Sequence, residues 1–203
     1  MGISRRRVSS FTAALSVVVL SPTLALAHTG GGATHGFMHG FMHPVTGLDH
    51  VMAMVTVGIL AWQMGGRALW AVPASFVALM ALGTAAGVMG VDMPFVELGI
   101  ALSVVVLGAA VALDIRAPLA LAMGLVGFFA LFHGHAHGAE MPENAGGLAY
   151  GAGFMLATAA LHLTGIGIGL VLGRVAQMQG RAWTRATGAV ICLVGVGIVS
   201  GML

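Results

Sequence analysis

The sequence predicts an all-α protein: a polytopic membrane bundle of six transmembrane helices after a cleaved signal peptide. Three observations predict it, namely the scarcity of charge, the apolar runs, and the layout of the N-terminus. Of the 203 residues, 59% are hydrophobic and 7% are charged. Soluble domains carry about 25% charged residues. Because so few charges cannot cover a water-facing surface, we expect a lipid bilayer to be the solvent.

The N-terminus has the layout of a secretory signal peptide. Three arginines at 5–7 form a basic segment, residues 11–20 are apolar, and small residues occupy both cleavage-determining positions of Ala25-Leu26-Ala27. The alternative is an uncleaved first helix, but the apolar stretch is short and Pro22 interrupts it. The expected domains are a signal peptide at 1–27 and a six-helix transmembrane domain at 28–203.

Six apolar runs follow the signal peptide. About 20 apolar residues are needed to cross a bilayer core. The runs are long enough, and glycines such as Gly165, Gly167, Gly169 and Gly173 have the spacing that lets membrane helices approach closely. The predicted spans are 44–64, 68–90, 94–113, 117–133, 147–173 and 182–203.

The arginines predict the orientation. Cleavage leaves the mature N-terminus outside, and all five arginines beyond residue 27 then fall in inner loops, as the positive-inside rule requires. We expect a bacterial inner-membrane protein with both mature termini in the periplasm. Five arginines against six acidic residues make nucleic acid an unexpected partner, and a homo-oligomer is left open. The inner arginines are Arg67, Arg116, Arg174, Arg181 and Arg185.

Eight of the nine histidines fall at or near the predicted outer face. Neutral histidine is the commonest metal ligand. Three of them, His28, His35 and His39, precede the first span and could collect metal ions, as could His135. Two belong to a tandem His-Gly-Phe-Met repeat, which could equally be a dispensable lead-in. Only His162 is deep, near the middle of the fifth span.

The segment His43-Pro44-Val-Thr-Gly47-Leu-Asp49-His50 is the stronger signal. Proline is favoured at the first helical position, so we expect a helix to begin directly after His43. His43 and His50, seven residues apart, would then project from one face. An ionised Asp49 in hydrocarbon costs several kcal/mol unless it is paired or hydrated. The segment therefore predicts a metal-handling site, with an interhelical hydrogen bond as the alternative role for the aspartate.

A second cluster reads Phe132-His133-Gly-His135-Ala-His137-Gly-Ala-Glu140. On a helix, His133, His137 and Glu140 share a face, and His135 points away. The alternative is a hydrated loop that happens to be rich in histidine. Two further polar groups, Glu97 and His162, are expected to be buried as ligands, proton acceptors or interhelical hydrogen-bond partners.

The types of candidate ligand limit the metals that the protein could bind but do not select one of them. Imidazole and carboxylate without thiolate suit Ni²⁺, Co²⁺ or Zn²⁺, whereas thioethers from the 14 methionines would favour Cu(I) unless they only pack. No phosphate-binding GxxxxGK[ST] loop is present, so ATP hydrolysis by that route is excluded. We expect no prosthetic group and no enzymatic activity. The alternatives are a membrane-embedded zinc hydrolase, although no HExxH motif appears, and a metal-binding accessory subunit.

The two motifs together resemble those of the HupE/UreJ family of nickel permeases. The matching pieces are His43-Pro44-x-x-Gly47-x-Asp49-His50 and Phe132-His133-Gly134-x-Ala136-His137-Gly138-x-Glu140. Span count, length and signal peptide also fit. The resemblance implies a secondary permease for Ni²⁺, with cobalt carried by some members, that supplies hydrogenase or urease. It also implies that the histidines and acids of both motifs handle metal.

From the residues we expect an ion path that starts at the outer face. His43, Asp49 and His50 would meet His133, His137 and Glu140 there. Glu97 and His162 would pass the ion inward.

Overall fold

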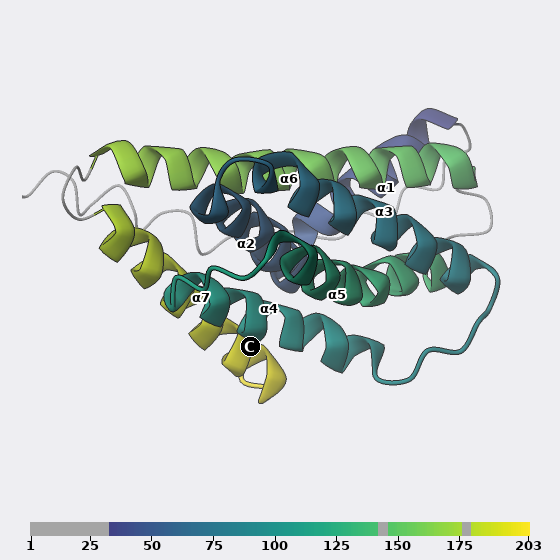
Figure 1. Ribbon diagram of the computed structural model, residues 1–203. Helices are drawn as coiled ribbons and strands as arrows, with labels where there is room; N and C mark the ends of the chain where they lie inside the picture. Colours follow the sequence, from purple (N-terminus) through teal and green to yellow (C-terminus); the bar gives the residue numbers. More distant parts are fainter. Residues whose placement is uncertain (1–32, 142–145, 176–179) are drawn as a thin grey trace, which may run out of the picture. The chain divides into compact units, whose positions relative to one another are not determined.

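The computed structural model describes residues 33–141, 146–175 and 180–203, and within these ranges it contains seven helices and no strand (Figure 1). The signal-peptide prediction, and His28 with it, lies outside the described residues. The helices are α1 (Ala33–Thr46), α2 (Leu48–Met64), α3 (Ala68–Val88), α4 (Val96–Ala112), α5 (Leu119–Ala139), α6 (Gly147–Val175) and α7 (Gly180–Val199).

The helices α2 to α7 coincide with the six predicted apolar runs, which confirms a multi-pass helical protein. Four of them, α3, α5, α6 and α7, are long and apolar enough to cross a membrane. The bent pair of α1 and α2 makes a fifth span if it is counted as one. With 17 residues, α4 is a shorter apolar helix. Six spans therefore stay a prediction.

The break between α1 and α2 corrects the predicted start of the first span. The helix does not begin after His43; α1 continues through Pro44 to Thr46, and α2 starts at Leu48 after a bend of 82°. The reason is Gly47, whose backbone is extended (φ −85°, ψ 120°). A Cβ there would lie 2.9 Å from Asp49 Oδ1, so glycine leaves room for that side chain to fold back without adjustment.

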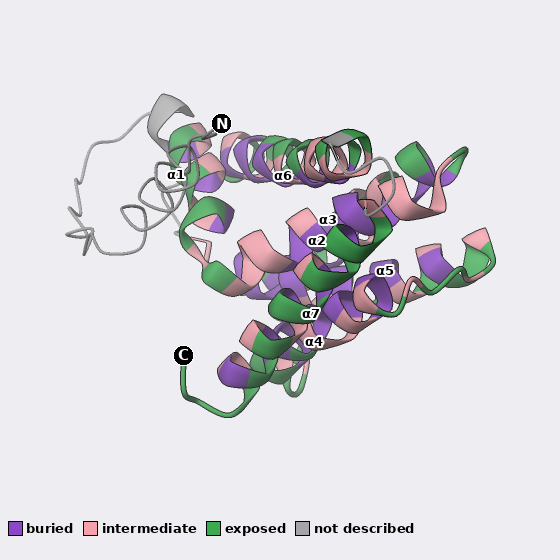
Figure 2. Ribbon diagram, turned by 90° about the vertical axis from the view of Figure 1, so that its left-hand side faces the viewer, coloured by how far each residue is buried: buried purple, intermediate pink, exposed green. Residues whose placement is uncertain are grey.

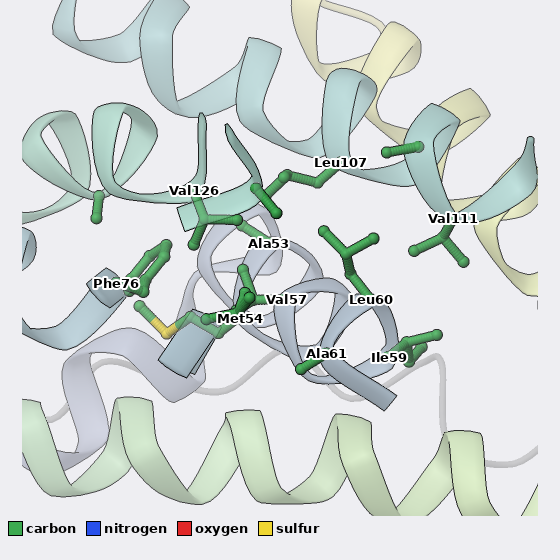
Figure 3. Close-up of a cluster of buried hydrophobic side chains, with 14 of the residues drawn as sticks. Ala53, Met54, Val57, Ile59, Leu60, Ala61, Phe76, Leu107, Val111 and Val126 are labelled. Carbon is green, nitrogen blue, oxygen red and sulfur yellow. The ribbon is translucent and has the colours of Figure 1, made fainter. Parts of the chain in front are cut away.

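Helix α2 is the centre of the packed core. Eight of its residues between positions 53 and 61 are buried, which is the pattern of a helix surrounded by other helices. Met54, Val57 and Leu60 pack among Phe76 of α3, Leu107 of α4 and Val126 of α5 (Figure 3). The first turn of α2, which carries the half-buried Asp49 and His50, is thereby held against the helical bundle.

Close contact at glycines sets the spacing of helices α3 and α5. A Cβ on Gly134 would overlap the Met80 carbonyl, and one on Gly138 would overlap the Thr84 carbonyl. From the other side, Gly83 lies against the backbone of Leu131. Small residues let backbones approach to van der Waals distance, and this dispersion contact holds membrane helices together.

A similar contact joins α2 to α6, where Gly58 and Gly165 face each other. The predicted role of Gly165 in close helix contact is thereby confirmed. The same prediction is wrong for Gly167, because nothing among the described residues lies within 4 Å of a Cβ built there.

Exposed residues lie on the outer sides of the helices (Figure 2), and many of them are large and apolar. Leu163 and Leu193 are 68% and 70% exposed. A water-soluble surface would not hold so many of them, and lipid is the solvent in which they are at low free energy.

Polar contacts mark one end of the bundle. Gln63 near the end of α2 donates to the Val111 carbonyl (3.1 Å), and Arg185 near the start of α7 donates to the Ala112 carbonyl (2.8 Å). The ends of α2 and α4 and the start of α7 therefore lie together. The loops with Arg67 and Arg116 follow α2 and α4 directly, so they belong to this same end.

Replacing Gly134 with alanine should test the contact between α3 and α5. The added methyl overlaps the Met80 carbonyl, and we expect the free energy of unfolding in detergent to fall by about 1–3 kcal/mol. The matched control is Gly124→Ala on the same helix, where the Cβ meets open space. The control should be neutral or gain about 0.5–1 kcal/mol from helix propensity. Equal effects of the two changes would contradict the packing described.

Candidate metal site

Histidines from three helices come together near one end of the bundle. His43 lies in the last turn of α1, His50 in the first turn of α2, and His133 and His137 lie one turn apart on α5. The ring centroid of His137 is 4.6 Å from that of His43 and 4.5 Å from that of His50. The rings of His50 and His133 are 4.7 Å apart. The two sequence motifs thus meet in space, although His43 and His50 lie on different helices.

Asp49 orients His50. Its Oδ1 accepts a hydrogen bond from the His50 backbone N–H and another from His50 Nδ1, both at 2.8 Å. Because a carboxylate oxygen only accepts, the ring proton of His50 lies on Nδ1 and the lone pair on Nε2. A carboxylate behind a histidine in this way fixes the orientation and the tautomer of the ring.

Glu140 and His43 form the outer rim of the cluster. His43 Nε2 is 3.5 Å from Glu140 Oε2, and the side chains are 31% and 59% exposed. Tyr150 of α6 lies beside this pair, with its ring centroid 5.7 Å from that of His39 and 6.3 Å from that of His43. The rim therefore combines imidazole and carboxylate groups that water can reach.

The inner histidines present buried nitrogens. Within the described part of the chain, four ring nitrogens of the cluster have no hydrogen-bond partner, and burial of such atoms without a partner is unfavourable. They are His50 Nε2, His133 Nδ1, His137 Nδ1 and His137 Nε2. A nitrogen lone pair in this position can be satisfied by a cation or by water. In the conformation seen, no three His, Cys, Asp or Glu side chains of 33–141, 146–175 and 180–203 are arranged to hold one ion.

A second buried histidine lies beyond the cluster. His162 of α6 is 1% exposed, and neither of its ring nitrogens has a partner among the residues that the structure describes. The ring of Phe76 lies 5.0 Å from that of His162 and 5.7 Å from that of His133, centroid to centroid. Phe76 therefore adjoins both His133 of the cluster and His162.

Other predicted site residues lie apart from the cluster. Glu97 is exposed in the first turn of α4, and within the described ranges it has no ion pair or side-chain hydrogen bond; the prediction of a buried group is wrong. The run of apolar residues around it could not reveal which way it faces.

His135 points away from the face that His133 and His137 share, as predicted. Its Nε2 donates to the Val91 carbonyl (2.6 Å). His39 is exposed on α1, and the side chain of His35 lies outside the described residues.

Three residues near the cluster were missed in the sequence. They are Phe76, Ser103 and Tyr150. Ser103 carries a signal, because it is the one hydroxyl in the apolar run 94–113. Phe76 and Tyr150 carry none, since aromatic residues in apolar runs usually pack.

Comparison with known proteins assigns the family. Residues 15–198 match the family described as HupE / UreJ protein. The chain belongs to the HupE/UreJ family. It is 41% identical over 196 residues to Protein HupE of Rhizobium leguminosarum bv. viciae, which covers 96% of this chain and 100% of that relative. No solved structure matches. The resemblance seen in the two motifs is thereby confirmed, and nothing in these matches supports the hydrolase alternative.

Cross-linking should test the meeting of the two motifs. In a Cys192→Ala background, His43→Cys paired with Glu140→Cys should react with a short bifunctional thiol reagent, because the native side chains are 3.5 Å apart. The product is scored by gel mobility of the membrane-embedded protein. The control pair is His43→Cys with Arg67→Cys, which lie beyond opposite ends of α2, about 25 Å apart. Equal reaction of both pairs, or of neither, would contradict the arrangement.

Proposed function

We propose that this protein is a secondary transporter that imports Ni²⁺ across the bacterial inner membrane for hydrogenase or urease maturation. The family is associated with nickel and cobalt transport for these enzymes. The observation that carries the proposal is the convergence, beneath a rim of imidazole and carboxylate, of imidazole nitrogens from α2 and α5 that have no hydrogen-bond partner among the described residues. Such donors suit Ni²⁺, Co²⁺ and Zn²⁺, and the choice of nickel rests on the family.

The position of the arginines supports an outward-facing cluster. Gln63 and Arg185 lie at the end of the bundle that holds the Arg67 and Arg116 loops. His50 lies at the other end of α2, about 20 Å away by helical rise. Under the positive-inside rule, the arginine end is cytoplasmic and the histidine end periplasmic. Both mature termini would then be periplasmic.

Entry of the ion begins at the exposed rim. The Glu140 carboxylate attracts a divalent cation, and His43 replaces water in its hydration shell. His28, His35 and His39 would raise the local metal concentration, as would the charge of Glu97, whose helix starts at this same end. Its exposure makes Glu97 a residue of the outer face in this proposal and not an inward relay.

Transfer into the bundle uses the inner imidazoles. His137 adjoins both His43 and His50, so an ion released by the rim meets its ring next. Small rotations of side chains then bring His50 Nε2, His133 Nδ1 and a nitrogen of His137 around one ion. From there the ion passes Phe76 to reach His162. Imidazoles at each step replace part of the hydration that the ion loses.

The membrane potential is sufficient to drive this path. A divalent ion moving inward gains about 4.6 kcal/mol per 100 mV, twice the value for a single charge. Import therefore needs no ATP.

Loss of an inner imidazole should abolish uptake. We expect His50→Ala and His137→Ala each to lower ⁶³Ni uptake by cells at least about tenfold, because loss of even an outer-shell partner costs 10–100-fold in metal affinity. Thr187→Val is the control; this partly exposed residue of α7 lies outside the histidine cluster, and its hydroxyl donates to the Trp183 carbonyl. Excess Co²⁺, Zn²⁺ or Cu⁺ as competitor ranks the metals. Wild-type uptake in both histidine variants, at equal protein level, would refute the proposed path.

Reporter fusions should test the proposed orientation. Alkaline phosphatase fused after Leu203 should be active and green fluorescent protein at the same point should be dark, because that end lies in the periplasm. Fusions in the segment 176–179, between Arg174 and Arg181, are the control and should give the opposite pair of results. N-terminal sequencing of the purified protein should begin at His28. The reverse pattern of reporters would place the histidine cluster in the cytoplasm.

A further inference from the structure

Ser103 of α4 is the buried polar neighbour of His133. It is fully buried, and its Oγ lies 2.9 Å from His133 Nε2. The same Oγ lies 2.6 Å from the Ile100 carbonyl, one turn earlier on α4. Helix α4 supplies none of the four clustered histidines, so this hydroxyl is its contribution to their surroundings.

The serine has one proton for these two contacts. The Ile100 carbonyl can only accept, so a contact of 2.6 Å between the oxygens requires the serine to donate to it. Ser103 Oγ therefore has only lone pairs to offer His133. A hydrogen bond at 2.9 Å then requires the proton of His133 to lie on Nε2.

We infer that Ser103 is a positioning residue that holds His133 with its proton on Nε2 and its lone pair on Nδ1, ready for a metal ion. His133 Nδ1 is buried and has no hydrogen-bond partner among the described residues. The ring of His133 adjoins that of His50. Because His50 Nδ1 donates to Asp49, the nitrogen of His50 that keeps its lone pair is Nε2. The nitrogen that binds metal is set by the hydrogen bond that the other nitrogen makes.

Comparison with a second serine separates this role from packing. Ser75 of α3 is also buried and also donates to the carbonyl three residues earlier, that of Val72 (2.8 Å). Within the described ranges its other hydrogen bond goes to the Met123 carbonyl at 3.5 Å, and it bonds no histidine there. Replacing either serine with alanine should therefore affect folding in the same way. Only the replacement of Ser103 should also affect His133.

Nuclear magnetic resonance should test the tautomer directly. In metal-free protein labelled with ¹⁵N-histidine and reconstituted in lipid, His133 should show a protonated Nε2 and an unprotonated Nδ1. Its signals are assigned by their loss in His133→Gln. In Ser103→Ala that preference should be lost, and in Ser75→Ala it should persist. A proton on Nδ1 in the wild type, or an unchanged spectrum in Ser103→Ala, overturns the assignment.

Uptake kinetics should test the consequence for transport, which rests on the proposed function. Ser103→Ala should raise the half-saturation concentration for ⁶³Ni about tenfold, with little change in maximal rate, and Ser75→Ala should leave both unchanged. Unchanged half-saturation in Ser103→Ala would refute the positioning role. Absence of nickel uptake by the wild type would instead refute the proposed function, and the spectrum of His133 would still decide the tautomer.

Discussion

The close approach of α3 and α5 is the contact on which the histidine cluster depends. Gly134 and Gly138 lie against the carbonyls of Met80 and Thr84, so the two backbones are held at a spacing that no side chain at these positions allows. His133 and His137 each precede one of these glycines. On a helix, adjacent residues lie 100° apart, so the glycines fix α5 to α3 and the histidines are turned toward α2. One turn of α5 thus provides both attachment and ligand geometry.

Around the packed helices α3 and α5, the polar neighbours of each histidine determine which of its ring nitrogens keeps a lone pair for metal. Asp49 uses Nδ1 of His50, and Ser103 uses Nε2 of His133. His137 has no such neighbour among the described residues, and both of its nitrogens are without a partner. It lies between the rim and the inner histidines, where an ion must be received on one side and released on the other. A buried ring without a hydrogen-bond partner in the described part of the chain is suited to that exchange, whereas a ring with an orienting partner is suited to holding an ion.

The sequence alone predicted much of this site, and the limits of that prediction have physical causes. Charge scarcity and apolar run length determine the helices, and the i, i+4 spacing determines which residues of α5 share a face, since both follow from local geometry. The bend at Gly47 was missed because it depends on where the Asp49 side chain folds. Ser103 and Phe76 were missed because their partners are far away in the chain. Glu97 was misplaced because position in an apolar run does not reveal which side faces the bundle.

The helices differ greatly in length. With 29 residues, α6 extends about 43 Å, whereas the 17 residues of α4 extend about 25 Å. A hydrocarbon layer about 30 Å thick cannot match both when they stand upright. Tilt, or projection of the Arg174 end into the headgroups, accommodates α6, and local thinning of the lipid would accommodate α4 as the sixth span that the sequence predicts. The protein should therefore deform the bilayer unevenly around its circumference, and the thickness of the surrounding membrane becomes a variable that acts on its stability.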